Sequence, residues 1–144
     1  MEFVFDDGGR KDAGFKGTTS DCVCRAIAIA TEKPYAEIYA LINEFGAREH
    51  KTSTKGKSSA RTGVYKDTIR KVMEHLGWEW IPTMQIGQGC KVHLRADELP
   101  KGRLVVSVSK HEVAVIDGVI HDLSDCSRDG TRCVYGYFKK RDAA

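Results

Sequence analysis

The sequence predicts a single α+β domain of 144 residues, with helices in the N-terminal half packed on an antiparallel sheet formed by the C-terminal half. Two observations predict this class. Apolar residues recur at helical spacing between residues 21 and 77, and from Trp78 onward they alternate with a period near two. Helices that precede the strands, rather than alternating with them, are typical of an α+β domain. At this length residues 1–144 should form one compact unit.

The helices can be placed by their end signals. The first is expected over residues 21–31, with Ser20 or Asp21 as the N-cap. The second begins at Pro34, because proline is tolerated in a first turn, and is expected to stop at Gly46. A third helix is expected within residues 64–77, and strands are expected at 78–82, 91–94, 103–109, 112–116, 119–123 and 133–138.

Two segments are predicted to lie outside this framework. Residues 1–20 are rich in glycine and charge, so they should form an extended lead-in that is ordered only if it docks on the body. Residues 46–62 have almost no large apolar groups and should form a mobile basic loop. No aromatic residue interleaves with the basic side chains of this loop, so a solvated surface is favoured over nucleic-acid binding.

Composition excludes several classes of protein. The chain is 41% hydrophobic and 30% charged, and it has no apolar run approaching the roughly 18 residues of a membrane span. Its first residues are acidic and glycine-rich where a secretory signal would be basic and then apolar, so a cytoplasmic location is expected. Five cysteines, an odd number, fit a reducing compartment with at least one free thiol better than a disulfide framework.

Cys22 is the first candidate for chemistry. It lies at the start of the first predicted helix, where unsatisfied amides and the helix dipole favour a thiolate over a thiol. Cys24 follows two positions later and projects about 200° away on a helix, so it cannot share the same site. It is expected to pack as a small hydrophobic residue.

A histidine and a carboxylate are predicted to meet on one face of a hairpin. Asp117 and Gly118 form a preferred pair for a two-residue turn. In the register that this turn sets, Asp122 is the diagonal neighbour of His111, whereas His121 points to the opposite face. A carboxylate beside an imidazole fixes its tautomer and stabilises its protonated form. With Cys22, the sequence therefore supplies a nucleophile, a base and an orienting group.

These segments resemble the papain-like cysteine peptidase superfamily. The Asp-Cys step that enters an alanine-rich helix, followed far downstream by "KHEVAVIDGVIHD", is most similar to the compact bacteriocin-processing peptidases and to small uncharacterised proteins of tailed bacteriophages. The resemblance implies a papain-like fold. It also implies that Cys22 is the nucleophile, His111 the general base and Asp122 the orienting residue.

The family also uses a side-chain donor to the oxyanion, usually a glutamine, and here the sequence departs from it. Lys16 stands six residues before Cys22, at the expected position. Lys16, Thr18, Thr19 or Ser20 could donate to an oxyanion beside the backbone amide of Cys22. The expected function is a cysteine peptidase or related thiol acyl-transfer hydrolase that acts on a peptide or protein in the cytoplasm, the host cytoplasm if the chain is phage-encoded. The alternative is a catalytically inactive papain-like protein that binds a host protein.

No cofactor or metal is expected. Structural zinc sites usually contain C-x-x-C pairs, whereas this chain has one C-x-C and widely separated single residues. The spacing therefore does not favour zinc, although several side chains could serve as ligands: Cys22, Cys24, Cys90, Cys126, Cys133, His93 and His121.

Overall fold

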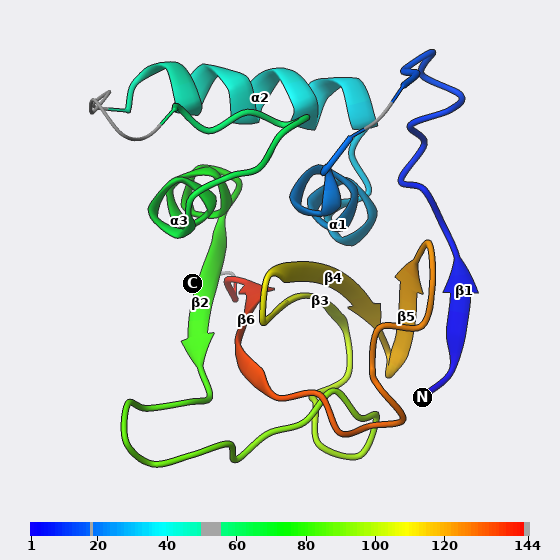
Figure 1. The fold of residues 1–144 in the computed structure, drawn as a ribbon, viewed down its shortest axis with the longest axis vertical. Coiled ribbons are helices and arrows are strands. Elements are labelled where there is room, and N and C mark those ends of the chain that lie inside the picture. The colour runs from blue at the N-terminus through cyan, green and yellow to red at the C-terminus, as the bar shows by residue number, and fades with distance from the viewer. Residues whose placement is uncertain (18, 50–55, 143–144) are drawn as a thin grey trace.

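A computed structural model describes residues 1–17, 19–49 and 56–142, and it confirms the α+β class. Figure 1 shows α2 outermost, with α1 and α3 between α2 and the sheet. The elements in chain order are β1 (Phe3–Phe5), α1 (Cys22–Thr31), α2 (Tyr35–Ala47), α3 (Lys66–His75), β2 (Trp78–Pro82), β3 (Arg103–Val108), β4 (His111–Ile116), β5 (Val119–Asp122) and β6 (Val134–Lys140).

The six strands form one sheet in the order β1-β5-β4-β3-β6-β2. All neighbouring pairs are antiparallel except β1 and β5, which are parallel. The expected purely antiparallel C-terminal sheet therefore needs one correction, because the N-terminal lead-in contributes an edge strand. The backbone amides of Ile120 and Asp6 extend this pairing by donating to Glu2 and Asp122 carbonyls, each at 2.9 Å.

Both faces of the sheet are covered, which explains why the central strands are almost continuously apolar. On one face Val105, Ala114 and Phe138 pack with the helices in the larger core. On the other face Val106 and Val113 belong to a second core, which is closed by the segments that connect the strands. The start of β4 and the end of β5 lie together beside the start of α1.

The β4–β5 hairpin has the predicted register. Ala114 pairs with His121 and Ile116 with Val119. Asp117 and Gly118 have φ values of 48° and 80°, as a turn with two left-handed residues requires. This agreement places Asp122 on the same face as His111.

Gly46 does not end the second helix, contrary to the prediction, because α2 continues through it to Ala47. A Cβ at Gly46 would lie 2.2 Å from the Ser58 carbonyl oxygen. The glycine is therefore needed for the close approach of a neighbouring segment, and not for a helix stop.

The predicted mobile loop 46–62 is also corrected in part. Residues 46 and 47 belong to α2, and residues 50–55 lie outside the described residues. Beyond them, Ser58 and Ala60 are 5% and 1% exposed. The Ala60 amide donates to Asn43 Oδ1 at 2.9 Å, and the Ser58 amide donates to Glu49 Oε1 at 2.6 Å. Hydrogen bonds to Asn43 in α2 and to Glu49 just beyond it therefore hold this segment in place, although it has few large apolar side chains.

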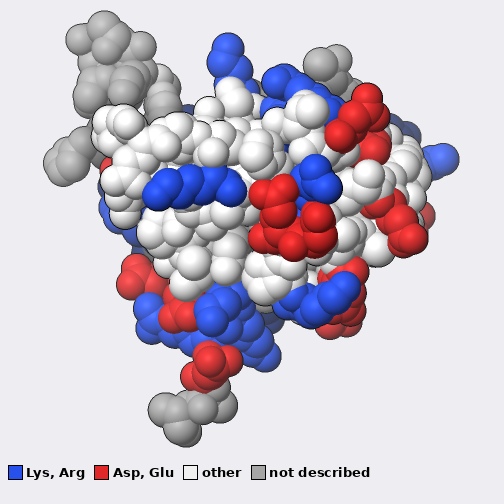
Figure 2. Space-filling model, turned by 90° about the horizontal axis from the view of Figure 1, so that it is seen from below, with Lys and Arg blue, Asp and Glu red and all other residues white. Residues whose placement is uncertain are grey.

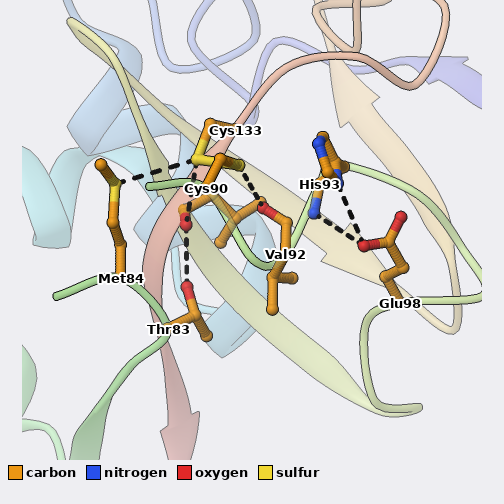
Figure 3. The surroundings of a disulfide bond; sticks show 8 residues. Thr83, Met84, Cys90, Val92, His93, Glu98 and Cys133 are labelled. Atoms are coloured by element: carbon orange, nitrogen blue, oxygen red, sulfur yellow. Dashed lines mark hydrogen bonds and ion pairs between the residues drawn. A yellow bond between two sulfur atoms is a disulfide. The ribbon is translucent and has the colours of Figure 1, made fainter. Parts of the chain in front are cut away.

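The expected strand at 91–94 forms only an isolated bridge between His93 and Cys133. Two backbone hydrogen bonds of 2.8 Å flank this bridge, and Leu94 then turns into the second core. A disulfide joins Cys90 to Cys133, with the Met84 sulfur 3.8 Å from Cys133 Sγ (Figure 3). The cysteines therefore include one bridge that the composition did not lead us to expect, while Cys22, Cys24 and Cys126 are free thiols.

Among the described residues, the structure contains no helix with the length and apolar character that crossing a membrane requires.

Candidate active site

Cys22 is the first residue of α1 and is half-buried. The preceding residue, Asp21, occupies the N-cap position, but its side chain makes no capping hydrogen bond, contrary to the prediction that Ser20 or Asp21 would cap the helix. Asp21 instead accepts a hydrogen bond from the Tyr35 hydroxyl at 2.7 Å and pairs closely with Arg25. Since Asp21 leaves the first-turn amides uncapped, they can stabilise negative charge at Cys22.

His111 and Asp122 meet as the hairpin register predicts. His111 Nε2 lies 2.6 Å from Asp122 Oδ2, and the two side chains are 20% and 6% exposed. The Leu123 amide donates to the other carboxylate oxygen, Oδ1, at 2.7 Å. Burial alone would raise the pKa of Asp122, but its hydrogen bonds and the positive charges of His111 and Arg25 hold that pKa below its ordinary value. Asp122 is therefore an ionised carboxylate beside the imidazole.

Cys22 completes the arrangement, because its side chain lies close enough to His111 to influence the ionisation of the imidazole. Burial lowers the pKa of His111, but the hydrogen bond with Asp122 and the nearby side chains of Cys126 and Cys22 raise it to about 11. The structure thus brings together the three side chains that the sequence selected, from α1, β4 and β5. Nucleophilic thiol chemistry needs a thiol, an imidazole and a carboxylate in this order, and these are the three groups present here.

A buried group of charged side chains contacts Asp122 and the start of α1. An Arg25 guanidinium nitrogen, Nη2, lies 3.3 Å from Asp122 Oδ1, and Arg25 also bonds to Asp21 one helical turn earlier. Arg10 Nε approaches Asp21 at 3.8 Å. Sequence reasoning missed Arg25, although an acid and a base four residues apart on a helix were a visible signal. Arg25 connects the start of α1 to the orienting carboxylate.

Cys126 is a second thiol at the same histidine, and no sequence pattern placed it there. It lies in the segment after β5 and is half-buried. Its sulfur and the donor atoms of His111 and Asp122 all lie within 4.8 Å of one another. Only the folding of the chain after Asp122 could reveal this contact.

The expected oxyanion donors are less well placed. Lys16 is exposed, and the Arg61 guanidinium donates to its carbonyl at 3.1 Å. The Thr19 hydroxyl donates to the Arg61 carbonyl at 3.1 Å, and the amide of the exposed Ser20 donates to the same carbonyl at 2.7 Å. Thr18 lies outside the described residues. The Thr19 hydroxyl, which was predicted as a possible donor to an oxyanion, therefore already donates to the Arg61 carbonyl.

The remaining candidates are separated from this site. Cys24 is fully buried, and burial raises the pKa of its thiol to about 12, so it is an inert core residue as predicted. His121 points to the other side of β5, where its Nδ1 lies 3.5 Å from Asp6. His93 pairs with Glu98 near the disulfide (Figure 3).

Charges of both signs are mixed on the face of the molecule opposite the helices. Figure 2 views the molecule from below, opposite the helices, and shows lysine and arginine side chains interspersed with acidic ones. Comparisons with family models, curated proteins and solved structures find no match to this chain.

Proposed function

We propose that this protein is a cysteine-dependent peptidase or related amide hydrolase of papain-like type, with Cys22 as nucleophile, His111 as general base and acid, and Asp122 as orienting residue. One observation carries the proposal: a helix-terminal thiol, a histidine and a buried carboxylate come together, with the Cys22 side chain acting on the ionisation of His111 and with 2.6 Å between His111 Nε2 and Asp122 Oδ2.

The reaction has two halves. The Cys22 thiolate attacks the carbonyl carbon of a peptide or protein amide, and His111 gives its proton to the leaving amine, so that a thioester forms and an amine departs. His111 then takes a proton from water as the water attacks the thioester, which releases a carboxylic acid and restores the Cys22 thiolate and the protonated His111. The uncapped amides at the start of α1 stabilise the oxyanion in both halves. Asp122 keeps the ring in one orientation throughout.

The three free thiols provide an internal test by alkylation with iodoacetamide and peptide mapping. Cys22 should react fastest, because it combines a helix N-terminus with His111. Cys126 is the matched comparison, since its sulfur also lies within 4.8 Å of a ring nitrogen of His111 but is at no helix start. Cys24 should react slowest, because it is fully buried. If Cys126 or Cys24 reacts as fast as Cys22, Cys22 is not the nucleophile.

A second candidate function, an inactive papain-like protein that binds a host protein, is favoured by the engagement of Thr19 with Arg61. An activated ester such as p-nitrophenyl acetate separates the two candidates. A hydrolase should release one p-nitrophenol per chain rapidly and then turn over steadily. A rapid release without later turnover would show that Cys22 is acylated but that the oxyanion and water sites are incomplete, and would support the binding protein.

A further inference from the structure

Cys126 is a thiol beside the proposed catalytic base that the proposed reaction does not use. Its sulfur, a ring nitrogen of His111 and a carboxylate oxygen of Asp122 lie within 4.8 Å of one another. We propose that His111, Asp122 and Cys126 form a zinc-binding site, and that a bound Zn²⁺ blocks thiol chemistry at Cys22 by occupying the base. The inhibitory role rests on the proposed function, whereas metal binding itself does not.

The donor set fits zinc better than the hard cations. Thiolate, imidazole and carboxylate are its usual ligands, and Mg²⁺ and Ca²⁺ prefer oxygen alone. Zinc bonds are about 2.0–2.3 Å long, so donor atoms in a tetrahedral site lie roughly 3–4 Å apart. The present cluster therefore reaches zinc geometry through side-chain adjustments of about 1 Å. Three protein ligands leave the fourth position to water.

The surroundings of Asp122 prepare one oxygen for this role. Oδ1 accepts the Leu123 amide and pairs with Arg25, whereas Oδ2 faces His111 at 2.6 Å. A zinc ion would replace the proton shared by Oδ2 and the ring, while the contacts to Oδ1 hold the carboxylate in place. Thiolate and carboxylate together supply two negative charges against the charge of the ion, and Arg25 stays on the far oxygen.

Access and position also fit. His111 and Cys126 are only partly buried, so an ion can enter from solvent. The ligands come from the start of β4, the end of β5 and the segment after it, with spacings of 11 and 4 residues. That spacing matches no zinc motif, which is why the sequence did not favour a metal. Cys22 lies outside the group of three, so zinc should bind without it.

The test is titration of the full chain with Zn²⁺ by calorimetry, with the Cys90–Cys133 disulfide intact and no thiol reductant present. Wild type should bind one ion. Cys126→Ser should weaken binding by at least a hundredfold, since loss of an outer-shell partner alone costs about 10–100-fold. The matched thiol variant Cys22→Ser should bind within a few-fold of wild type. Substitution with Co²⁺ should give a thiolate charge-transfer band in wild type and Cys22→Ser, but not in Cys126→Ser.

Zinc should also protect Cys126 from iodoacetamide in the wild-type chain, a measurement that needs no variant to fold. Equal zinc affinity in wild type and Cys126→Ser, loss of binding in Cys22→Ser, or absence of protection would each overturn the site. Fast labelling of Cys22 in metal-free protein would still support the proposed function, so failure of one proposal is distinguishable from failure of the other.

Discussion

The molecule contains two groupings of cysteine, histidine and carboxylate that differ in almost every physical respect. At the start of β4, His111 lies 2.6 Å from Asp122, and the side chains are 20% and 6% exposed. In the segment between β2 and β3, His93 lies 3.2 Å from Glu98, and the side chains are 36% and 28% exposed. Free thiols lie beside the first group. In the second group, Cys133 forms a backbone β-bridge with His93, and its sulfur is held in a disulfide.

The difference shows that residue types alone do not make a reactive site. Asp122 is buried with a guanidinium and a backbone amide on one oxygen, so its charge is fixed at the imidazole. Glu98 lies at the surface, where its pKa is lowered chiefly by the hydrogen bond with His93 and where solvent screens its charge. Burial with satisfied partners is therefore what separates the candidate active site from an ordinary surface pair.

The largest expected effect comes from replacing each of the two histidines, His111 and His93, with glutamine. His111→Gln should slow alkylation of Cys22 at neutral pH by at least about a hundredfold, because general-base assistance contributes about 10²–10⁴-fold. His93→Gln should leave that rate unchanged, since His93 lies near the disulfide and not near Cys22. Rates from mass spectrometry would check both. Equal rates in wild type and His111→Gln would mean that the histidine does not activate the thiol.

The next matched pair of variants replaces Arg25, which contacts Asp122, and Arg95, which contacts Glu98. Arg25→Met should lower the free energy of unfolding by about 3 kcal/mol, because it removes the cation that contacts both of the buried carboxylates Asp21 and Asp122. Arg95→Met should leave the urea midpoint unchanged, since Arg95 pairs with Glu98 at the surface. Urea unfolding followed by circular dichroism would measure both. A similar midpoint for the two variants would contradict the energetic distinction between the groupings.

The smallest expected effect concerns Glu112, a third carboxylate, which is buried without a cationic partner in a salt bridge within the described part of the chain. The effect is on the pH dependence of the free energy of unfolding. Glu112, next to His111 on β4, is 8% exposed, accepts a hydrogen bond from Ser107 at 2.5 Å, and leaves Oε2 without a partner among the described residues. Burial raises its pKa from 4.5 to about 7. The folded state therefore keeps a proton that the unfolded state releases, and stability from this group falls as pH rises from 4.5 to 7.

Glu112→Gln removes this dependence. Relative to wild type, the variant should gain on the order of 2 kcal/mol in unfolding free energy between pH 4.5 and pH 8, since one pKa unit corresponds to about 1.4 kcal/mol. Urea titrations at the two pH values would measure it. A constant difference across this range would show that Glu112 ionises as readily in the fold as in the unfolded chain.

Local patterns predicted much of the fold. The helices, the β4–β5 hairpin and the pairing of His111 with Asp122 follow from short-range periodicity and turn chemistry, which are encoded within a few residues. The errors arose where distant segments decided the outcome. Gly46 is needed because the Ser58 backbone packs closely against it. The N-terminal lead-in forms an edge strand because it pairs with β5.

By itself, the sequence determined which thiol begins a helix and which carboxylate shares a face with His111, because helix ends and a two-residue turn fix these relations locally. Only the tertiary structure decided that Cys22 meets His111, that Arg25 holds Asp122 and that Cys126 joins them. Those contacts span up to 97 residues and depend on how α1 packs across the ends of β4 and β5. Periodicity carries no information about which side chains such packing brings together.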